Sequence, residues 1–160
     1  MSRRAQVLAD RLQQGSQTLA AFVESLSDTE WRMKVPKDGR TVGVIVHHVA
    51  SVYPLEIQLA QSVAAGKPVV GVTWDAVADM NAKHAQEHAE VRKPEALELL
   101  HRNSQVAAEA VRAFSDEQLD AAAPVSLNSD APLSAQFLIE DHALRHSFHH
   151  LARIRTTVGR

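Results

Sequence analysis

Residues 41–59 run Thr-Val-Gly-Val-Ile-Val-His-His-Val-Ala-Ser-Val-Tyr-Pro-Leu-Glu-Ile-Gln-Leu, and this stretch decides the fold class. Thr41 can cap a helix that continues to about Ala65, and Pro54 inside it is expected to kink it. At about 100° per residue, one stripe of this helix is apolar apart from a single imidazole, and it consists of Val44, Ile45, His48, Val52, Leu55 and Leu59. The pattern predicts a long core helix with His48 facing the core, whereas His47, about a quarter turn away, is expected to face elsewhere.

Three further segments show the same helical spacing of apolar residues, and they cover residues 4–26, 94–114 and 133–158. A Gly/Val/Pro-rich stretch at 66–73 could hold a short strand but is predicted to be a crossover loop, and a shorter helix is expected over 75–87. Four long helices with one long connection predict an all-α fold, a four-helix bundle with a crossover connection.

A short pattern occurs twice, each time between two long helices. Ser-Asp-Thr-Glu-Trp at 27–31 is followed by Pro36, and Ser-Asp-Glu-Gln-Leu at 115–119 is followed by Pro124 at the same offset. Ser27 and Glu30 also have the spacing of a capping box. The pattern indicates either two related helical hairpins packed together or two independent uses of common cap chemistry.

Composition limits the class of protein. A chain of 160 residues, 45% hydrophobic, is long enough for one core and short for two, so residues 1–160 are expected to form a single domain. The net charge is -2, which lacks the basic surface of nucleic-acid or anionic-membrane binders. Neither a leader-like N-terminus nor a long uninterrupted apolar run is present, so we expect a cytoplasmic protein with no nucleic-acid or membrane partner.

Histidine and cysteine are used in an unusual ratio, nine against none. Without cysteine the chain supplies no disulfide, thiolate metal ligand or cysteine nucleophile. Any metal chemistry would therefore use histidines, and any thiol would come from a co-substrate.

Four histidines of the last long helix fall within an arc of about 100°, namely His142, His146, His149 and His150. His146 and His150 are four apart, so both can bind one ion; His142 with His146, and His146 with His149, offer similar pairings. With His48 from another helix, such a pair gives three nitrogen ligands and an open position, the catalytic type of zinc site, which nickel would also suit.

The pattern leaves open which face of this last long helix is covered. An apolar stripe of Leu133, Phe137, Leu144, Phe148 and Leu151 lies roughly opposite these histidines, which would leave the His face in solvent. Ala135, Leu138 and Ile139 on the His side instead favour a helix covered on both faces, with the metal in a cleft.

Residues 84–88, His-Ala-Gln-Glu-His, fit the H-x-x-E-H string of one metallopeptidase class, and we interpret them as a solvated helix end.

The segments around these histidines resemble the DinB/YfiT-like superfamily of four-helix-bundle metalloenzymes, which includes the metal-binding domains of mycothiol-dependent enzymes. Residues 41–50, with a single His in the ligand position, and residues 146–154, with H-x-x-x-H and the tail that follows, carry the likeness. The resemblance implies His48, His146 and His150 as metal ligands. The chain departs from the tail at Ala152 and Arg153, which puts in doubt a polar contact made there.

Together these observations favour a small metalloenzyme that activates a water or a low-molecular-weight thiol, either as a thiol-dependent transferase or isomerase or as a hydrolase. Zinc or nickel is the expected metal, and a small molecule the expected substrate. His142 and His149 are expected to shuttle protons, with Trp74 and Asn81 bordering the cleft. The resemblance also implies a homodimer. A non-catalytic metal-binding or dimerising bundle, and a metal-free interaction domain, are the alternatives.

Overall fold

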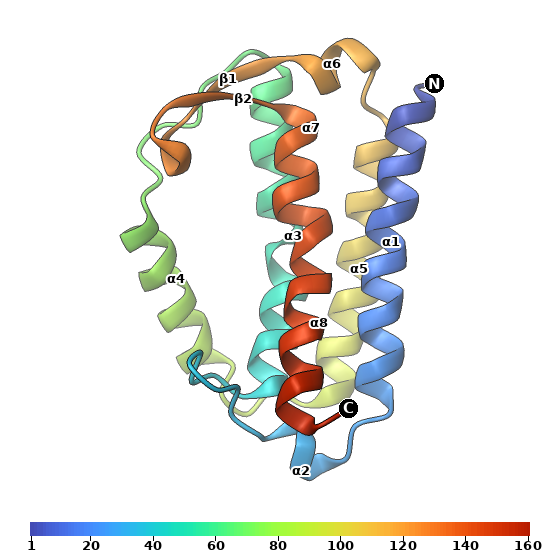
Figure 1. Cartoon of the computed structure of the whole chain (residues 1–160), viewed down its shortest axis with the longest axis vertical. Coiled ribbons are helices and arrows are strands. Elements are labelled where there is room, and N and C mark those ends of the chain that lie inside the picture. Colours follow the sequence, from blue (N-terminus) through green and yellow to red (C-terminus); the bar gives the residue numbers. More distant parts are fainter.

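Four long helical rods run roughly parallel in the computed structural model, which describes residues 1–160 (Figure 1). They are α1 (Arg3–Glu24), α3 (Val42–Ala64), α5 (Lys93–Arg112) and a composite of α7 (Ala135–Leu138), a π-helical turn (Ile139–Leu144) and α8 (Arg145–Val158). The connections contain α2 (Asp28–Trp31), α4 (Trp74–Glu87), α6 (Asp116–Asp120) and the strands β1 (Ala122–Val125) and β2 (Ala131–Ser134). The predicted four-helix bundle is confirmed, with α4 inside its crossover connection.

The order of the rods around the bundle differs from that of two simple hairpins. α5 packs against both α1 and α3, and the rod that ends in α8 closes the other side, again between α1 and α3. α1 and α3 therefore lie diagonally opposite each other although they are consecutive long helices (Figure 1). The prediction of two packed hairpins is wrong in this respect, because the neighbours in the bundle come from different halves of the chain.

Side-chain caps start the helices where the sequence predicts them. Thr41 Oγ1 accepts from the amide of Val44 at the start of α3. Ser27 and Ser115 each form a capping box, with Glu30 and Gln118 as the reciprocal partners. The repeated pattern thus forms the same one-turn helix after α1 and after α5, and each such cap contributes about 1 kcal/mol.

Pro54 lies within α3, and the helix continues through it. A proline has no amide hydrogen, so the carbonyl four residues earlier loses its usual donor. That carbonyl belongs to Ala50, and Asn103 of α5 donates its side-chain amide to it at 2.9 Å. A neighbouring helix thereby satisfies the group that Pro54 leaves free, which explains how the core helix tolerates the proline.

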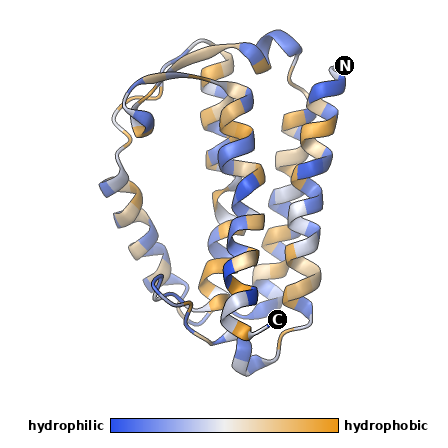
Figure 2. Ribbon diagram, in the orientation of Figure 1, coloured by the Kyte–Doolittle hydropathy of each residue, from blue (hydrophilic) through white to orange (hydrophobic).

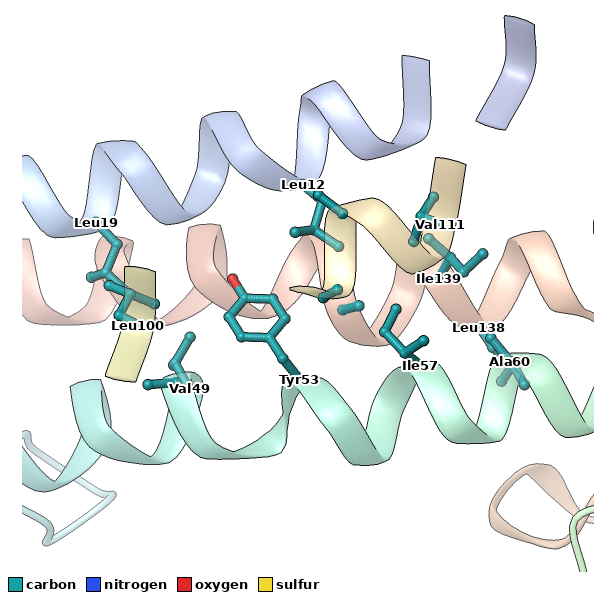
Figure 3. Close-up of a cluster of buried hydrophobic side chains, with 14 of the residues drawn as sticks. Leu12, Leu19, Val49, Tyr53, Ile57, Ala60, Leu100, Val111, Leu138 and Ile139 are labelled. Carbon is teal, nitrogen blue, oxygen red and sulfur yellow. The ribbon is translucent and has the colours of Figure 1, made fainter. Parts of the chain in front are cut away.

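The core lies between the four rods and contains 36 buried hydrophobic residues. Orange hydrophobic bands recur along each long helix in Figure 2, as expected from the spacing in the sequence. Tyr53 lies near the centre of the bundle, and its hydroxyl points from α3 into the space between the other helices (Figure 3). By length and composition α3 could cross a membrane, but 61% of its most apolar window is buried, as in the core helix of a bundle.

A small hairpin that the sequence does not predict covers one end of the bundle (Figure 1). β1 and β2 pair antiparallel, and a 3₁₀ turn (Ser126–Asn128) follows β1. The chain then reverses direction at Ser129 and Asp130, whose backbones lie in the left-handed region with φ of 57° and 59°. Val69 of the crossover forms a parallel bridge with Val125, so the predicted loop at 66–73 is partly strand-like.

The last rod is also less regular than the single helix predicted over 133–158. The π-helical turn at 139–144 contains one residue more per hydrogen-bonded turn than an α-helix, which rotates everything after it relative to a regular helix. Phe137 and Phe148, predicted on the buried stripe, are each 39% exposed. Ser147, His150 and Ile154 are buried after the turn. The apolar stripe seen in the sequence is therefore only partly buried, since Leu144 and Leu151 are buried whereas Phe137 and Phe148 are not.

Candidate metal centre

Three imidazoles from two helices meet at one side of the bundle. His48 belongs to α3, and His146 and His150 lie one turn apart on α8. The Nε2 atoms of His146 and His150 face each other at 3.0 Å. The His48 ring stands edge-on to both, with centroids 5.0 Å from His146 and 5.7 Å from His150. One nitrogen from each of the three residues lies within 4.8 Å of the others, so the structure brings together the three residues predicted as ligands.

A buried carboxylate supports this cluster. Glu56 is 7% exposed, and its Oε1 lies 3.0 Å from His146 Nδ1, although the two are not aligned for a hydrogen bond. A carboxylate on the far nitrogen of an imidazole favours the tautomer whose other nitrogen is free to bind a metal. Glu56 was not predicted from the sequence. Its signal was available, because Glu56 is the single charged residue of α3 and lies eight residues after His48.

Burial keeps two of these imidazoles neutral. Burial, which is the larger cause, and the neighbouring His146 together lower the pKa of His48 to about 3. The same causes, in the same order, lower the pKa of His150 to about 2. A histidine must be neutral to bind a metal. Both residues are therefore in the ligand form throughout the physiological pH range.

A cavity of about 290 Å³ opens beside the cluster, between α3, α4 and the last rod. Trp74 and Asn81 of α4 line it, and the Trp74 indole donates to the carbonyl of Leu127 at 2.9 Å. Both residues lie at the cleft as the sequence analysis expected. The cavity reaches His48, His146 and His150 on its inner side, so a small molecule in it would contact the cluster.

Arg40 also lines this cavity, and it was not identified from the sequence. Its guanidinium holds Asp38 through two hydrogen bonds of 2.6 and 2.9 Å, and this contact keeps the pKa of Asp38 below its usual value. Arg153 reaches the same carboxylate at 3.4 Å. Arg153, one of the two residues at which the tail departs from the superfamily pattern, thus ties α8 to the loop before α3. Nη1 of Arg40 is buried without a partner.

The two histidines expected to shuttle protons lie in different places. His142 lines the cavity, and its Nε2 is buried with no hydrogen-bond partner. His149 is exposed and faces a separate depression beside Pro36 and Thr156. The prediction that His149 serves the site is not supported by this placement. The residue points outward because α8 is regular, and positions 146 and 150 of that helix face the cleft.

A second group of imidazoles lies on the other side of α3. His47, expected away from the core, is only 9% exposed, because α4 covers that side of the helix. Its Nδ1 lies 2.8 Å from Nε2 of His84, and its ring centroid is 3.9 Å from that of His88. The segment 84–88 therefore faces the bundle at both histidines, and its interpretation as a solvated helix end is wrong for these two side chains.

The model of one protein family, mycothiol S-transferase, matches residues 7–155. The chain belongs to this family. The match spans nearly the whole chain and includes both segments that carry the resemblance to the DinB/YfiT-like superfamily, which is thereby confirmed. Comparison with curated proteins gives no significant match.

Two solved structures share the fold of this family member. YfiT from Bacillus subtilis, described as a probable metal-dependent hydrolase with an unusual four-helix bundle topology, aligns with a TM-score of 0.75 at 19% identity, covering 98% of this chain and 87% of YfiT. The colibactin self-resistance protein ClbS, solved with double-stranded DNA, aligns with a TM-score of 0.70 at 15% identity, covering 94% of this chain and 92% of ClbS. At these identities the likeness shows the fold.

The cluster fits a divalent transition metal on its own geometry. It offers three nitrogen donors with two Nε2 atoms facing one another. The buried Oε2 of Glu56 has no hydrogen-bond partner, so a carboxyl oxygen beside the cluster is left unsatisfied within the protein. Three imidazoles with a carboxylate behind one of them are a common environment for zinc and other first-row ions.

Proposed function

We propose that this chain is a metal-dependent S-transferase that joins a low-molecular-weight thiol to a small electrophile. The observation that carries the proposal is the meeting of His48, His146 and His150 at the inner wall of a 290 Å³ cavity. Membership of the mycothiol S-transferase family supports a thiol as one substrate. The lack of cysteine fits this chemistry, because the sulfur nucleophile comes from the co-substrate.

His48, His146 and His150 would hold the metal, for which zinc and nickel are both suitable. When bound, a divalent ion lowers the pKa of a thiol or a water so that it reacts as an anion at neutral pH. Glu56 Oε1, 3.0 Å from His146 Nδ1, would favour the tautomer of His146 that presents Nε2 to the metal. The side chains of α4 that line the cavity would cover a bound substrate on its outer side.

The transfer step requires a place for the thiol proton. The sulfur lone pair forms the new carbon–sulfur bond while the leaving group departs with its bonding pair. His142 is the imidazole at the cavity outside the triad, and its Nε2 has no hydrogen-bond partner, although Asp141 Oδ2 lies 3.9 Å away. We assign it the role of accepting the thiol proton and returning it to the leaving group. Arg40 Nη1, also without a partner, would hold an acceptor group of the substrate.

The test is a rate comparison with a panel of thiols and an alkylating or epoxide electrophile. Metal-loaded wild type should accelerate conjugate formation, His146→Ala should abolish the acceleration, and His149→Ala should leave it unchanged because His149 faces away. Equal rates for wild type and His146→Ala would refute the enzymatic proposal and favour a non-catalytic metal-binding bundle. Consumption of a substrate without thiol, dependent on His146, would identify a hydrolase instead.

The remaining expectations about partners stay predictions. The net charge of -2 supports the absence of a nucleic-acid partner, and the complex of ClbS with DNA concerns that protein. A homodimer and a cytoplasmic location remain to be tested, by sedimentation and by fractionation.

A further inference from the structure

α4 is an unusual helix because none of its fourteen residues is buried. A surface helix is ordinarily held by the apolar face that it buries. At its N-terminal end α4 is joined to the hairpin region by the Trp74 hydrogen bond to Leu127. At its C-terminal end the contact with α3 is made by imidazoles. This end of the helix therefore depends on a polar cluster for its position.

The cluster consists of His47 of α3 and His84 and His88 of α4. His84 and His88 are four residues apart, so both side chains lie on the same face of α4. The ring centroids are 5.0 Å apart for His47 and His84, 3.9 Å for His47 and His88, and 4.6 Å for His84 and His88. One donor nitrogen from each lies within 4.8 Å of the other two.

Hydrogen bonding alone accounts for only part of this arrangement. His84 Nε2 lies 2.8 Å from His47 Nδ1 and 3.3 Å from Ser51 Oγ. His84 Nδ1 is buried without a partner, although a buried polar atom normally finds one. The His88 ring packs within 3.9 Å of His47, yet no hydrogen bond joins them. Three convergent imidazoles, one of them with a buried nitrogen that lacks a partner, are better explained by a shared ion.

We propose that His47, His84 and His88 form a second divalent-metal site, separate from the cluster at His146, which clamps the end of α4 onto α3. Its donors are all imidazole nitrogens, which suit zinc and copper(II) better than magnesium or calcium. The site shares no ligand with the first cluster, although the His48 and His84 rings are 5.7 Å apart.

The role of this site is to position α4. Glu87, the acid of the H-x-x-E-H string, is exposed and pairs with Lys83 at 3.7 Å, so it does not serve as a base there. Trp74, Met80 and Asn81 of the same helix line the cavity at the first cluster. A metal at the second site would therefore fix the outer wall of the substrate cleft.

The experiment measures zinc stoichiometry by titration calorimetry and elemental analysis on the tag-free full chain. Wild type should bind two equivalents. The double variant His84→Ala/His88→Ala should bind one equivalent, and so should His146→Ala/His150→Ala. His101 is an exposed histidine of α5, so the control His101→Ala should bind two. Since α4 buries no residue, substitutions at His84 and His88 leave the core intact, and His84→Gln/His88→Gln provides a second pair that must agree.

Hydrogen exchange gives a readout independent of stoichiometry. Free zinc at about 100 times its dissociation constant should slow exchange through local opening of α4 by about 100-fold in wild type, and not in His84→Ala/His88→Ala. Wild type that binds one equivalent, with no change on substitution of His84 and His88, would overturn the second site. If wild type binds one equivalent of zinc and that equivalent depends on His84 and His88, the result counts against the proposed function and supports the second site.

Discussion

The metal-free protein is predicted to lose stability as the pH falls from 8 to 5. His48 and His150 are buried and neutral in the folded state, with pKa values of about 3 and about 2. In the unfolded chain both return to about 6.5. Below pH 6.5 the unfolded state therefore binds protons that the folded state does not, and the free energy of unfolding decreases as the pH falls. Above pH 7 neither state binds them, so this contribution is constant.

The size of the effect follows from these values. At pH 5 a histidine that titrates at about 6.5 unfolded and about 3 folded stabilises the protein by about 2 kcal/mol less than at pH 8. His150 adds a similar amount, so the two together remove about 4 kcal/mol, a large share of the 5–15 kcal/mol typical of a domain. Ordinary carboxyl groups titrate mostly below pH 5, which keeps them from dominating this window.

Urea unfolding of chelator-treated protein at several pH values provides the assay. With a slope of about 2 kcal/mol per molar urea, the midpoint should fall by at least about 2 M between pH 8 and pH 5, because the lowered pKa values of His47, His84 and His149 act in the same direction. His48→Gln and His150→Gln should each remove about 2 kcal/mol of this pH dependence, about 1 M in the midpoint, whatever they do to stability at pH 8, and His101→Gln should leave it intact. A midpoint that stays constant over this range would show that the imidazoles protonate freely in the folded protein and would refute the reasoning.

Three further predictions concern stability and can be checked by urea unfolding. Gly43→Ala should destabilise by about 1 kcal/mol, because its Cβ would lie 2.6 Å from the Trp31 ring and the overpacking outweighs the gain in helix propensity; a more stable variant would contradict this. Arg40→Met should cost about 3 kcal/mol, because the buried Asp38 carboxylate would keep only the backbone amide of residue 40 and Arg153, both at 3.4 Å, and a loss below about 1 kcal/mol would mean that the pair is solvated. Ser115→Ala should cost about 1 kcal/mol through its lost cap, so an unchanged midpoint would show that α6 needs no cap.

Local sequence signals predicted much of the fold. Caps at Thr41, Ser27 and Ser115 determine where three helices start, and each depends on residues within one turn. The diagonal placement of α1 and α3 could not be predicted in this way, because it depends on contacts between halves of the chain. The π-helical turn at 139–144 was also missed, since its one extra residue leaves no mark in the spacing of a single sequence.

The candidate site was predicted only as far as patterns within a single helix allow. His48 was identified by its stripe, and His146 and His150 by their separation of four residues, both of which are properties of one helix. His47 was misjudged because a helical wheel of α3 does not show that α4 covers that side. His84 and His88 looked like a solvated helix end because their partner lies 37 residues away from His84.

The central claim, that His48, His146 and His150 hold a divalent metal, is tested most directly by anomalous diffraction at the zinc edge from crystals of the zinc-loaded, tag-free protein. We expect a peak about 2.0–2.1 Å from one nitrogen of each of these three residues. A well-diffracting crystal with no peak there, or with zinc bound only at exposed histidines such as His101 and His149, would contradict it.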